Sequence, residues 1–222
     1  MNLNHRKRLL FIWIVALVAA CAPAAPPVPP APSRPPEPPI SELYGKLSEQ
    51  GGYFDSDNLI SNETSYLHAL DDLRTKAVRG GAYIGVGPDQ SFSYIAEIKP
   101  ELAFIIDIRR DNMLQHLMFR SMFLRSTNRM DFLARLIGAD IPGDIKRWTG
   151  KPIEEIVAVL DSAMRSPATF LRVSAEVVED AKATGIPLSE ADIATMIGFH
   201  HEFHQLGLQI RYTSKNRPPR LS

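Results

Sequence analysis

The chain opens with a short basic stretch followed by one unbroken apolar run. Arg6, Lys7 and Arg8 precede 12 consecutive apolar residues at positions 9–20. This run has the length of the apolar part of an export signal and is shorter than the roughly 20 residues that span a bilayer. The pattern therefore predicts a signal peptide over residues 1–20.

A proline-rich stretch separates this apolar run from the rest of the chain. Of the 18 prolines, 10 lie between positions 23 and 39. Such a stretch cannot bury a core and is expected to be extended, so we interpret residues 21–40 as a tether and residues 41–222 as one domain. A proline-rich recognition motif for a partner is the alternative interpretation.

Within the domain, the spacing of apolar residues predicts two buried strands among many helices. Apolar residues dominate positions 82–86 and 102–108, as is typical of buried strands, and 208–212 is a weaker candidate for a third. The fold class we expect is α/β, with a small parallel sheet of partial Rossmann-like type and a large helical region. The expected helices cover residues 61–78, 88–98, 111–124, 128–137, 152–163, 167–184 and 190–206.

Capping residues support the limits of the later helices. Ser166 and Ser189 stand where N-caps are expected, because their hydroxyls can accept from free backbone N–H groups. Gly138, Gly185 and Gly207 stand where helices would end, because glycine adopts the left-handed conformation easily.

Charge and cysteine content exclude several classes of protein. Without residues 1–20, the chain has 22 basic and 25 acidic residues, a net charge of −3, so we expect no nucleic-acid partner. A single cysteine excludes a disulfide framework and a cysteine-based zinc site.

That single cysteine, Cys21, directly follows Val18, Ala19 and Ala20. This ending resembles the bacterial lipobox, which implies cleavage before Cys21, lipidation of Cys21 and a membrane partner through the lipid. Ala22 then favours the outer membrane of the cell envelope if the host is Gram-negative. The alternatives are an ordinary signal with a chance cysteine and an uncleaved anchor.

A glycine-rich turn and a carboxylate form the main candidate site. Gly85 and Gly87 stand between the first strand and a helix, and Asp107 follows 22 residues after Gly85, near the end of the second strand. Glycines allow a ligand to approach the backbone, a helix start presents free N–H groups, and an acid at this place can accept both ribose hydroxyls. The spacing predicts a nucleoside-type ligand; a strand–turn–helix unit without a ligand is the alternative.

This segment resembles the first two motifs of Rossmann-like S-adenosylmethionine-dependent methyltransferases. Gly85 and Gly87 match the first two glycines and Asp107 the ribose-binding acid, whereas Tyr83 replaces the usual acid and Asp89 the third glycine. The longer segment over residues 80–110 resembles the corresponding segment of an uncharacterised bacterial family of methyltransferase-like proteins. The similarity covers residues from about 53 to 220. The resemblance implies S-adenosylmethionine as a possible cofactor.

The resemblance also concerns how much of the family's domain this chain contains. Since the family continues with further strand–helix units, we expect a truncated chain with an exposed apolar sheet edge that self-associates at micromolar concentration.

Other polar groups are weaker candidates. His200 and His204 share a helix face and can chelate a metal, or they can simply form a polar helix end. Arg109 and Arg110 can clamp an anion or form ion pairs with acidic side chains. For His116 we expect a partly buried side chain whose hydrogen bonds are satisfied within the fold.

Two functions thus remain open, an envelope methyltransferase and a catalytically silent lipoprotein that binds a ligand or an envelope protein. Export favours the silent protein, because S-adenosylmethionine is made in the cytoplasm.

Overall fold

The computed structural model describes residues 38–52, 54, 59–61, 65–141 and 143–211. The predicted signal peptide, Cys21 and most of the predicted tether lie outside the described residues. No described helix is long and apolar enough to cross a membrane. The described residues belong to one compact unit that begins at Pro38.

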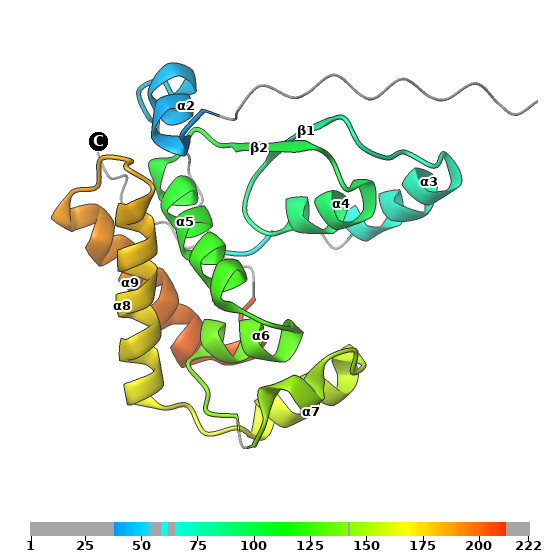
Figure 1. Ribbon diagram of the computed structural model, residues 1–222, viewed down its shortest axis with the longest axis vertical. Helices are drawn as coiled ribbons and strands as arrows, with labels where there is room; N and C mark the ends of the chain where they lie inside the picture. The colour runs from blue at the N-terminus through cyan, green and yellow to red at the C-terminus, as the bar shows by residue number, and fades with distance from the viewer. Residues whose placement is uncertain (1–37, 53, 55–58, 62–64, 142, 212–222) are drawn as a thin grey trace, which may run out of the picture. The chain divides into compact units, whose positions relative to one another are not determined.

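The described chain is mostly helical and contains one small parallel sheet, which confirms a mixed α/β fold. Strands β1 (Ala82–Val86) and β2 (Leu102–Ile106) pair in parallel, with Ala82 opposite Leu102 and Val86 opposite Ile106. Helix α4 (Gln90–Ile98) connects them (Figure 1). Strand β2 ends two residues earlier than expected, because the chain turns at Asp107, whose carboxylate accepts the backbone N–H of Arg109 at 2.9 Å.

The elements before the sheet differ from the sequence prediction. Helix α2 (Ile40–Leu47) was not predicted; its Tyr44 hydroxyl accepts from Nη1 of Arg110 at 2.6 Å. The helix expected over 61–78 is instead a 3-10 turn at Tyr66–His68 followed by α3 (Ala69–Thr75). It ends early because Ala77 takes a positive φ of 49°. Residues 62–64 lie outside the described residues.

The later helices agree closely with the predicted ranges. Ser166 accepts from the Thr169 N–H at 3.3 Å, and Ser189 forms a reciprocal capping box with Asp192. A further 3-10 turn at Ile145–Trp148 was not predicted. The observed helices are α5 (Arg110–Arg125), α6 (Arg129–Ile137), α7 (Ile153–Ser162), α8 (Pro167–Ala183) and α9 (Glu190–Leu206).

The third strand expected near 208–212 is absent from residues 208–211, the part of this segment that the structure describes. The chain forms a 3-10 turn there, Gly207–Gln209. Leu208 packs against the core of α6 and α7, and Arg165 donates to the carbonyl of His204 at 2.9 Å just before the turn. These contacts hold the segment against the helices instead of beside the sheet.

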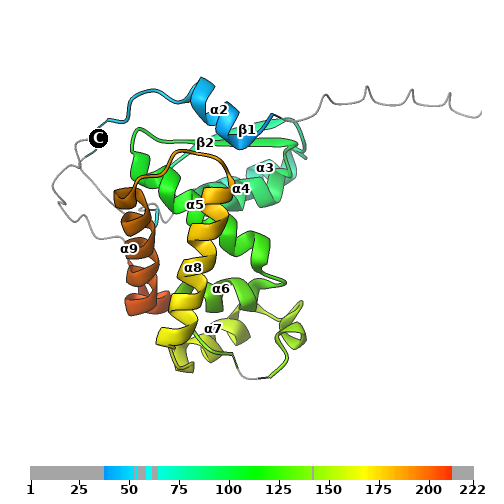
Figure 2. The ribbon, with the colours of Figure 1, turned by 60° about the vertical axis from the view of Figure 1, so that its left-hand side comes forward.

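The apolar core lies among the helices. Helices α5, α8 and α9 run alongside one another (Figure 2) and bury one cluster that includes Met118, Val177 and Phe199. A second cluster joins α6 and α7 around Met130 and Ile156. No side chain of β1 or β2 belongs to the buried apolar residues of the described chain.

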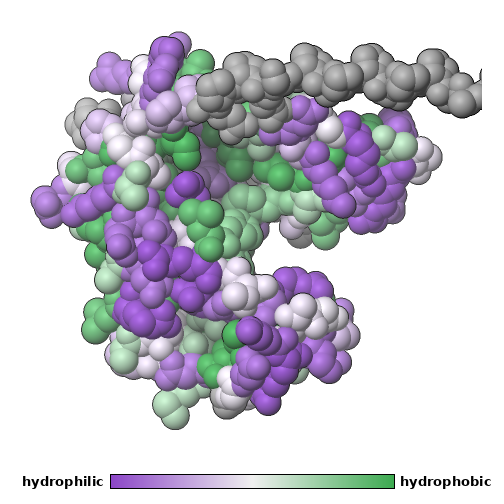
Figure 3. All heavy atoms as spheres, viewed as in Figure 1, coloured by the Kyte–Doolittle hydropathy of each residue, from purple (hydrophilic) through white to green (hydrophobic). Residues whose placement is uncertain are grey.

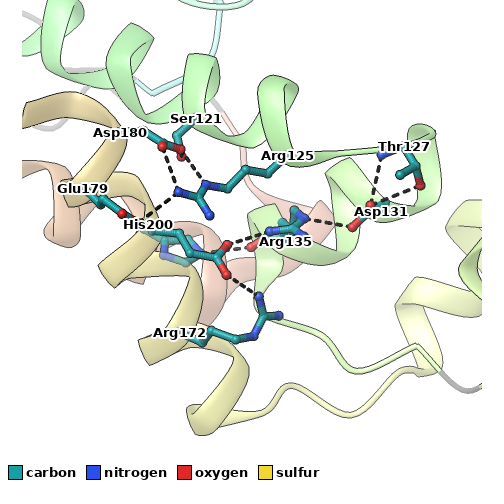
Figure 4. A network of polar contacts seen from close by, with 10 residues as sticks. Ser121, Arg125, Thr127, Asp131, Arg135, Arg172, Glu179, Asp180 and His200 are labelled. Atoms are coloured by element: carbon teal, nitrogen blue, oxygen red, sulfur yellow. Dashed lines mark hydrogen bonds and ion pairs between the residues drawn. The ribbon is translucent and has the colours of Figure 1, made fainter. Parts of the chain in front are cut away.

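Ion pairs join α8 to α5 and α6 beside this core (Figure 4). Asp180 accepts from Nε of Arg125 and from the hydroxyl of Ser121, both at 2.6 Å. Glu176 accepts from Arg135 at 2.7 Å. The Arg125 guanidinium lowers the pKa of Asp180 below its ordinary value. Because each acid has a cationic partner from another helix, we assign this network to fixing the helix arrangement.

Candidate functional site

The sheet register brings the predicted site residues to one edge. Val86 lies opposite Ile106, so Gly87 and Asp107 follow directly at the carboxyl ends of the two strands. Helices α4 and α5 both begin just after these ends, and their free N–H groups and positive dipole ends lie at this edge. The sequence prediction thus placed the two strands, the turn and the acid in the correct relation.

Gly85 has a structural reason to be glycine. A Cβ atom built on it would lie 2.5 Å from the Tyr83 hydroxyl and 2.7 Å from Oγ of Ser91. Tyr83 in turn lies beside Tyr94 of α4, with ring centroids 6.4 Å apart. The absent side chain therefore allows β1 and α4 to pack closely, and a direct contact of Gly85 with a ligand stays a prediction.

Gly87 forms the turn itself and contacts a histidine. Its φ of +87° lies in the region that favours glycine, and a Cβ there would meet only the Gln90 side chain, at 3.9 Å. Nε2 of His116, on α5, donates to the Gly87 carbonyl at 3.0 Å. Burial lowers the pKa of His116, although this hydrogen bond and the charges of Asp107 and Asp89 oppose the shift. His116 is thus neutral, and its hydrogen bond supports the turn. The spacing of residues along the helix did not predict this hydrogen bond.

Asp107 is held by its own neighbour, Arg109. One carboxylate oxygen accepts from the Arg109 backbone N–H at 2.9 Å and from Nε at 3.1 Å, and the other accepts from Nη2 at 3.2 Å. The guanidinium also lies over the ring of Phe54, 5.8 Å from its centroid. Ribose hydroxyls would therefore have to replace hydrogen bonds that Arg109 now makes.

Arg110 faces away from this edge. It forms a two-point pair with Asp192, at 2.9 Å and 3.0 Å, and donates to the Pro187 carbonyl at 2.7 Å. The arginine lowers the pKa of Asp192 to about 2. Both arginines of the candidate anion clamp thus pair with acids, which was the alternative interpretation of the sequence.

Asp89 also binds within the chain. Its Oδ1 accepts from the backbone N–H and from the hydroxyl of Ser61, both at 2.7 Å. Gln115 donates to the Leu59 carbonyl at 2.5 Å, so the segment 59–61 is fixed against both α4 and α5. The acid that replaces the third glycine of the motif therefore has a structural role.

Two buried polar atoms near the helix starts have no hydrogen-bond partner within the described chain. They are Oγ of Ser91, in the first turn of α4, and Oδ1 of Asn112, in the first turn of α5. Leaving such an atom unpaired costs about 1–3 kcal/mol, and both side chains are buried. Sequence reasoning missed them, since neither belongs to a motif.

Two of the three histidines of α9 bond to the end of α6. Nε2 of His200 donates to the Arg135 carbonyl at 3.0 Å, and its Nδ1 accepts from Ser174 Oγ at 2.8 Å. Nδ1 of His204 donates to the Ile137 carbonyl at 2.9 Å. Among the described residues no group of three or more metal-ligating side chains occurs. The observed geometry is that of a polar helix contact.

Comparison with family models matches residues 59–179, more than half of the chain, to a domain of unknown function (DUF7790). The matched range contains the sheet, α4 to α7 and most of α8. No curated protein matches the chain. No solved structure matches it either.

Proposed function

The chain belongs to the DUF7790 family, and we propose that it is a lipid-anchored envelope protein whose Rossmann-like β1–α4–β2 unit binds a nucleoside-type ligand of the S-adenosylmethionine class. The observation that carries this proposal is the register of the two strands. It brings the left-handed Gly87, Asp107 and the starts of α4 and α5 to one edge. Gly87, Asp107 and two helix starts at the carboxyl edge of a parallel sheet suit an adenosine-like group.

The charges near the turn favour a cationic ligand over a phosphate. Asp89 and Asp107 both lie near enough to His116 to raise its pKa by their charge, and His116 itself touches the turn. The Asp89 carboxylate repels a diphosphate and attracts the sulfonium of S-adenosylmethionine, whereas the charge of Asp107 is offset by its ion pair with Arg109. A dinucleotide is accordingly the weaker candidate.

The pairing of Asp107 with Arg109 favours a second candidate function. Because both carboxylate oxygens already accept from Arg109, an adenosine ribose gains less from this acid than from a free one. A catalytically silent lipoprotein that binds a ligand or an envelope protein does not require an Asp107 carboxylate that is free of Arg109. No residue of the described chain is assigned a catalytic role.

Calorimetry of the full chain with S-adenosylmethionine and S-adenosylhomocysteine tests the proposal. We expect measurable binding, and Asp107→Ala should weaken it roughly 10-fold or more, since a charge-assisted hydrogen bond contributes about 1.5–3 kcal/mol. Asp161→Ala, at an exposed carboxylate on α7, is the matched control and should bind as the wild type does. Wild-type protein that binds neither nucleoside would refute the proposal.

Methyl transfer separates the two candidate functions. Labelled S-adenosylmethionine is incubated with the protein and an envelope fraction. Transfer that Asp107→Ala reduces would support an enzyme, whereas binding without transfer would support the silent protein.

A further inference from the structure

One face of the small sheet is apolar, and no described part of the chain covers it. Tyr83 and Gly85 face α4, as their contacts with Tyr94 and Ser91 show, so the alternate residues of β1 point to the opposite side. The strand register places the alternate residues of β2 beside them. This open sheet face consists of Ala82, Ile84, Val86, Leu102, Phe104 and Ile106.

Its four large aliphatic side chains are exposed to solvent, whereas Phe104 is partly buried. Ile84 is 69% exposed, Val86 57%, Leu102 40% and Ile106 55%. Parallel sheets are normally covered on both faces, and neighbouring exposed apolar residues mark interaction sites. In the view of Figure 3, polar residues gather over α3 and α7, while apolar residues are visible at the strands and along α5.

We propose that a second copy of this chain covers the open sheet face, with the two sheets packed face to face about a two-fold axis. The six side chains of the face carry no charge, so an identical face meets it without burying a charge. Sheets pack in this way at about 10 Å separation, with interdigitating aliphatic side chains.

The size of the face sets the strength of this contact. Burying one aliphatic side chain completely removes roughly 60–120 Å² of apolar surface, so four half-exposed ones give on the order of 200 Å² per copy. A standard interface buries about 800 Å² per partner. The dimer is therefore weak and reversible, and anchoring both copies in one membrane raises its population.

A lipid surface fits this face less well than a second copy. In the described chain β1 pairs only with β2, so its outer edge keeps unpaired backbone N–H and C=O groups. Hydrocarbon cannot satisfy such groups. In a face-to-face dimer the edge stays in water while the apolar face is covered.

Cysteine cross-linking of the full chain in its membrane tests the proposal, since Cys21 is the only natural cysteine. Ile84→Cys treated with a short bismaleimide should yield a homodimer of twice the mass. Ser162→Cys, on the exposed surface of α7, and the wild type should yield none. Adding Val86→Asp to Ile84→Cys should reduce the cross-linked fraction at least several-fold, because the new charge would be buried in the interface.

Three results would overturn the proposal. The first is the absence of a homodimer from Ile84→Cys when a single maleimide still labels the residue. The second is a cross-link to a different protein. The third is labelling of Ile84→Cys only after detergent dissolves the bilayer, which would assign the face to lipid.

Discussion

At the scale of single residues, the polar side chains of this protein mostly bind within their own chain. His200 is the most buried example, with one ring nitrogen on Ser174 and the other on the Arg135 carbonyl. Burial lowers its pKa to about 4, and the neighbouring His204 and His201 add to that shift. A neutral imidazole in this place makes the contact between α9 and α6 sensitive to acid.

We predict that His200 makes the protein less stable as the pH falls. The unfolded chain takes up the proton near pH 6.5, whereas the folded chain does so only near pH 4. The stability contributed by neutral His200 is therefore complete above pH 6.5 and is lost as the pH falls toward 4, by about 3 kcal/mol. Urea denaturation of the wild type and of His200→Gln, repeated across this range, measures the effect.

The variant should be less stable at neutral pH, because Phe170 loses its ring contact, yet it should lose less stability on acidification. His116, whose pKa is also lowered, keeps part of the acid dependence in both proteins. His68→Gln, at an exposed position outside α9, should retain the wild-type slope. Equal slopes for the wild type and His200→Gln would contradict the assignment.

At the scale of elements, two glycines have opposite effects on stability. Gly85 lies in β1, where an added Cβ would meet Tyr83 and Ser91 below 3 Å, whereas Gly198 lies in the middle of α9 with no atom within 4 Å of that position. Strand Gly85 is thus required by packing against α4. Helix Gly198 only weakens its helix, because glycine loses more conformational freedom than alanine.

We predict opposite changes in stability for the two alanine substitutions. Gly198→Ala should raise the free energy of unfolding by about 0.5–1 kcal/mol. Gly85→Ala should lower it, because the Tyr83 ring and the Ser91 hydroxyl must move, so this variant is a poor probe of ligand binding alone. Chemical denaturation of both variants measures the effects. A neutral Gly85→Ala would show that the space beside Tyr83 is larger than the structure indicates.

The sequence predicted those elements whose signals are local. Ser189 and the helix it begins were expected and found, because a hydroxyl and free N–H groups a few residues apart determine the cap. The two strands and their order followed from apolar runs bounded by glycine and proline. Helix α2 and the turn at Gly207–Gln209 depend on distant contacts, with Arg110 and with the core of α6 and α7, and no local pattern encodes these.

The same distinction applies to the candidate site. Gly87 and Asp107 were placed correctly by spacing, since parallel strands of equal length bring their ends together. The hydrogen bonds of Asp107 to Arg109 and of His116 to the turn were not predicted. Both depend on the direction in which α5 leaves β2, which the sequence pattern leaves open.

At the scale of the whole molecule, stability and the candidate site are separated. The buried apolar clusters belong to the helices, whereas β1 and β2 contribute no buried apolar side chain in the described part of the chain. Regions with little buried apolar surface open at lower cost than the core. The sheet that carries Gly87 and Asp107 is thus suited to gain order from a ligand or from a second copy.

The predicted membrane attachment also belongs to this scale, and it rests on Cys21, which lies outside the described residues. We predict that Cys21→Ser leaves an uncleaved precursor that takes up no labelled fatty acid, because the thiol is the acceptor of the lipid. The wild type should incorporate the label and migrate as a protein about 20 residues shorter, as the signal length implies. Stable anchoring needs more than one acyl chain, since each buried CH₂ contributes roughly 0.8 kcal/mol. Ala24→Ser, three residues further on, is the matched control and should be processed normally. A Cys21→Ser protein that is cleaved and retained in the membrane like the wild type would show that the cysteine follows the signal by chance.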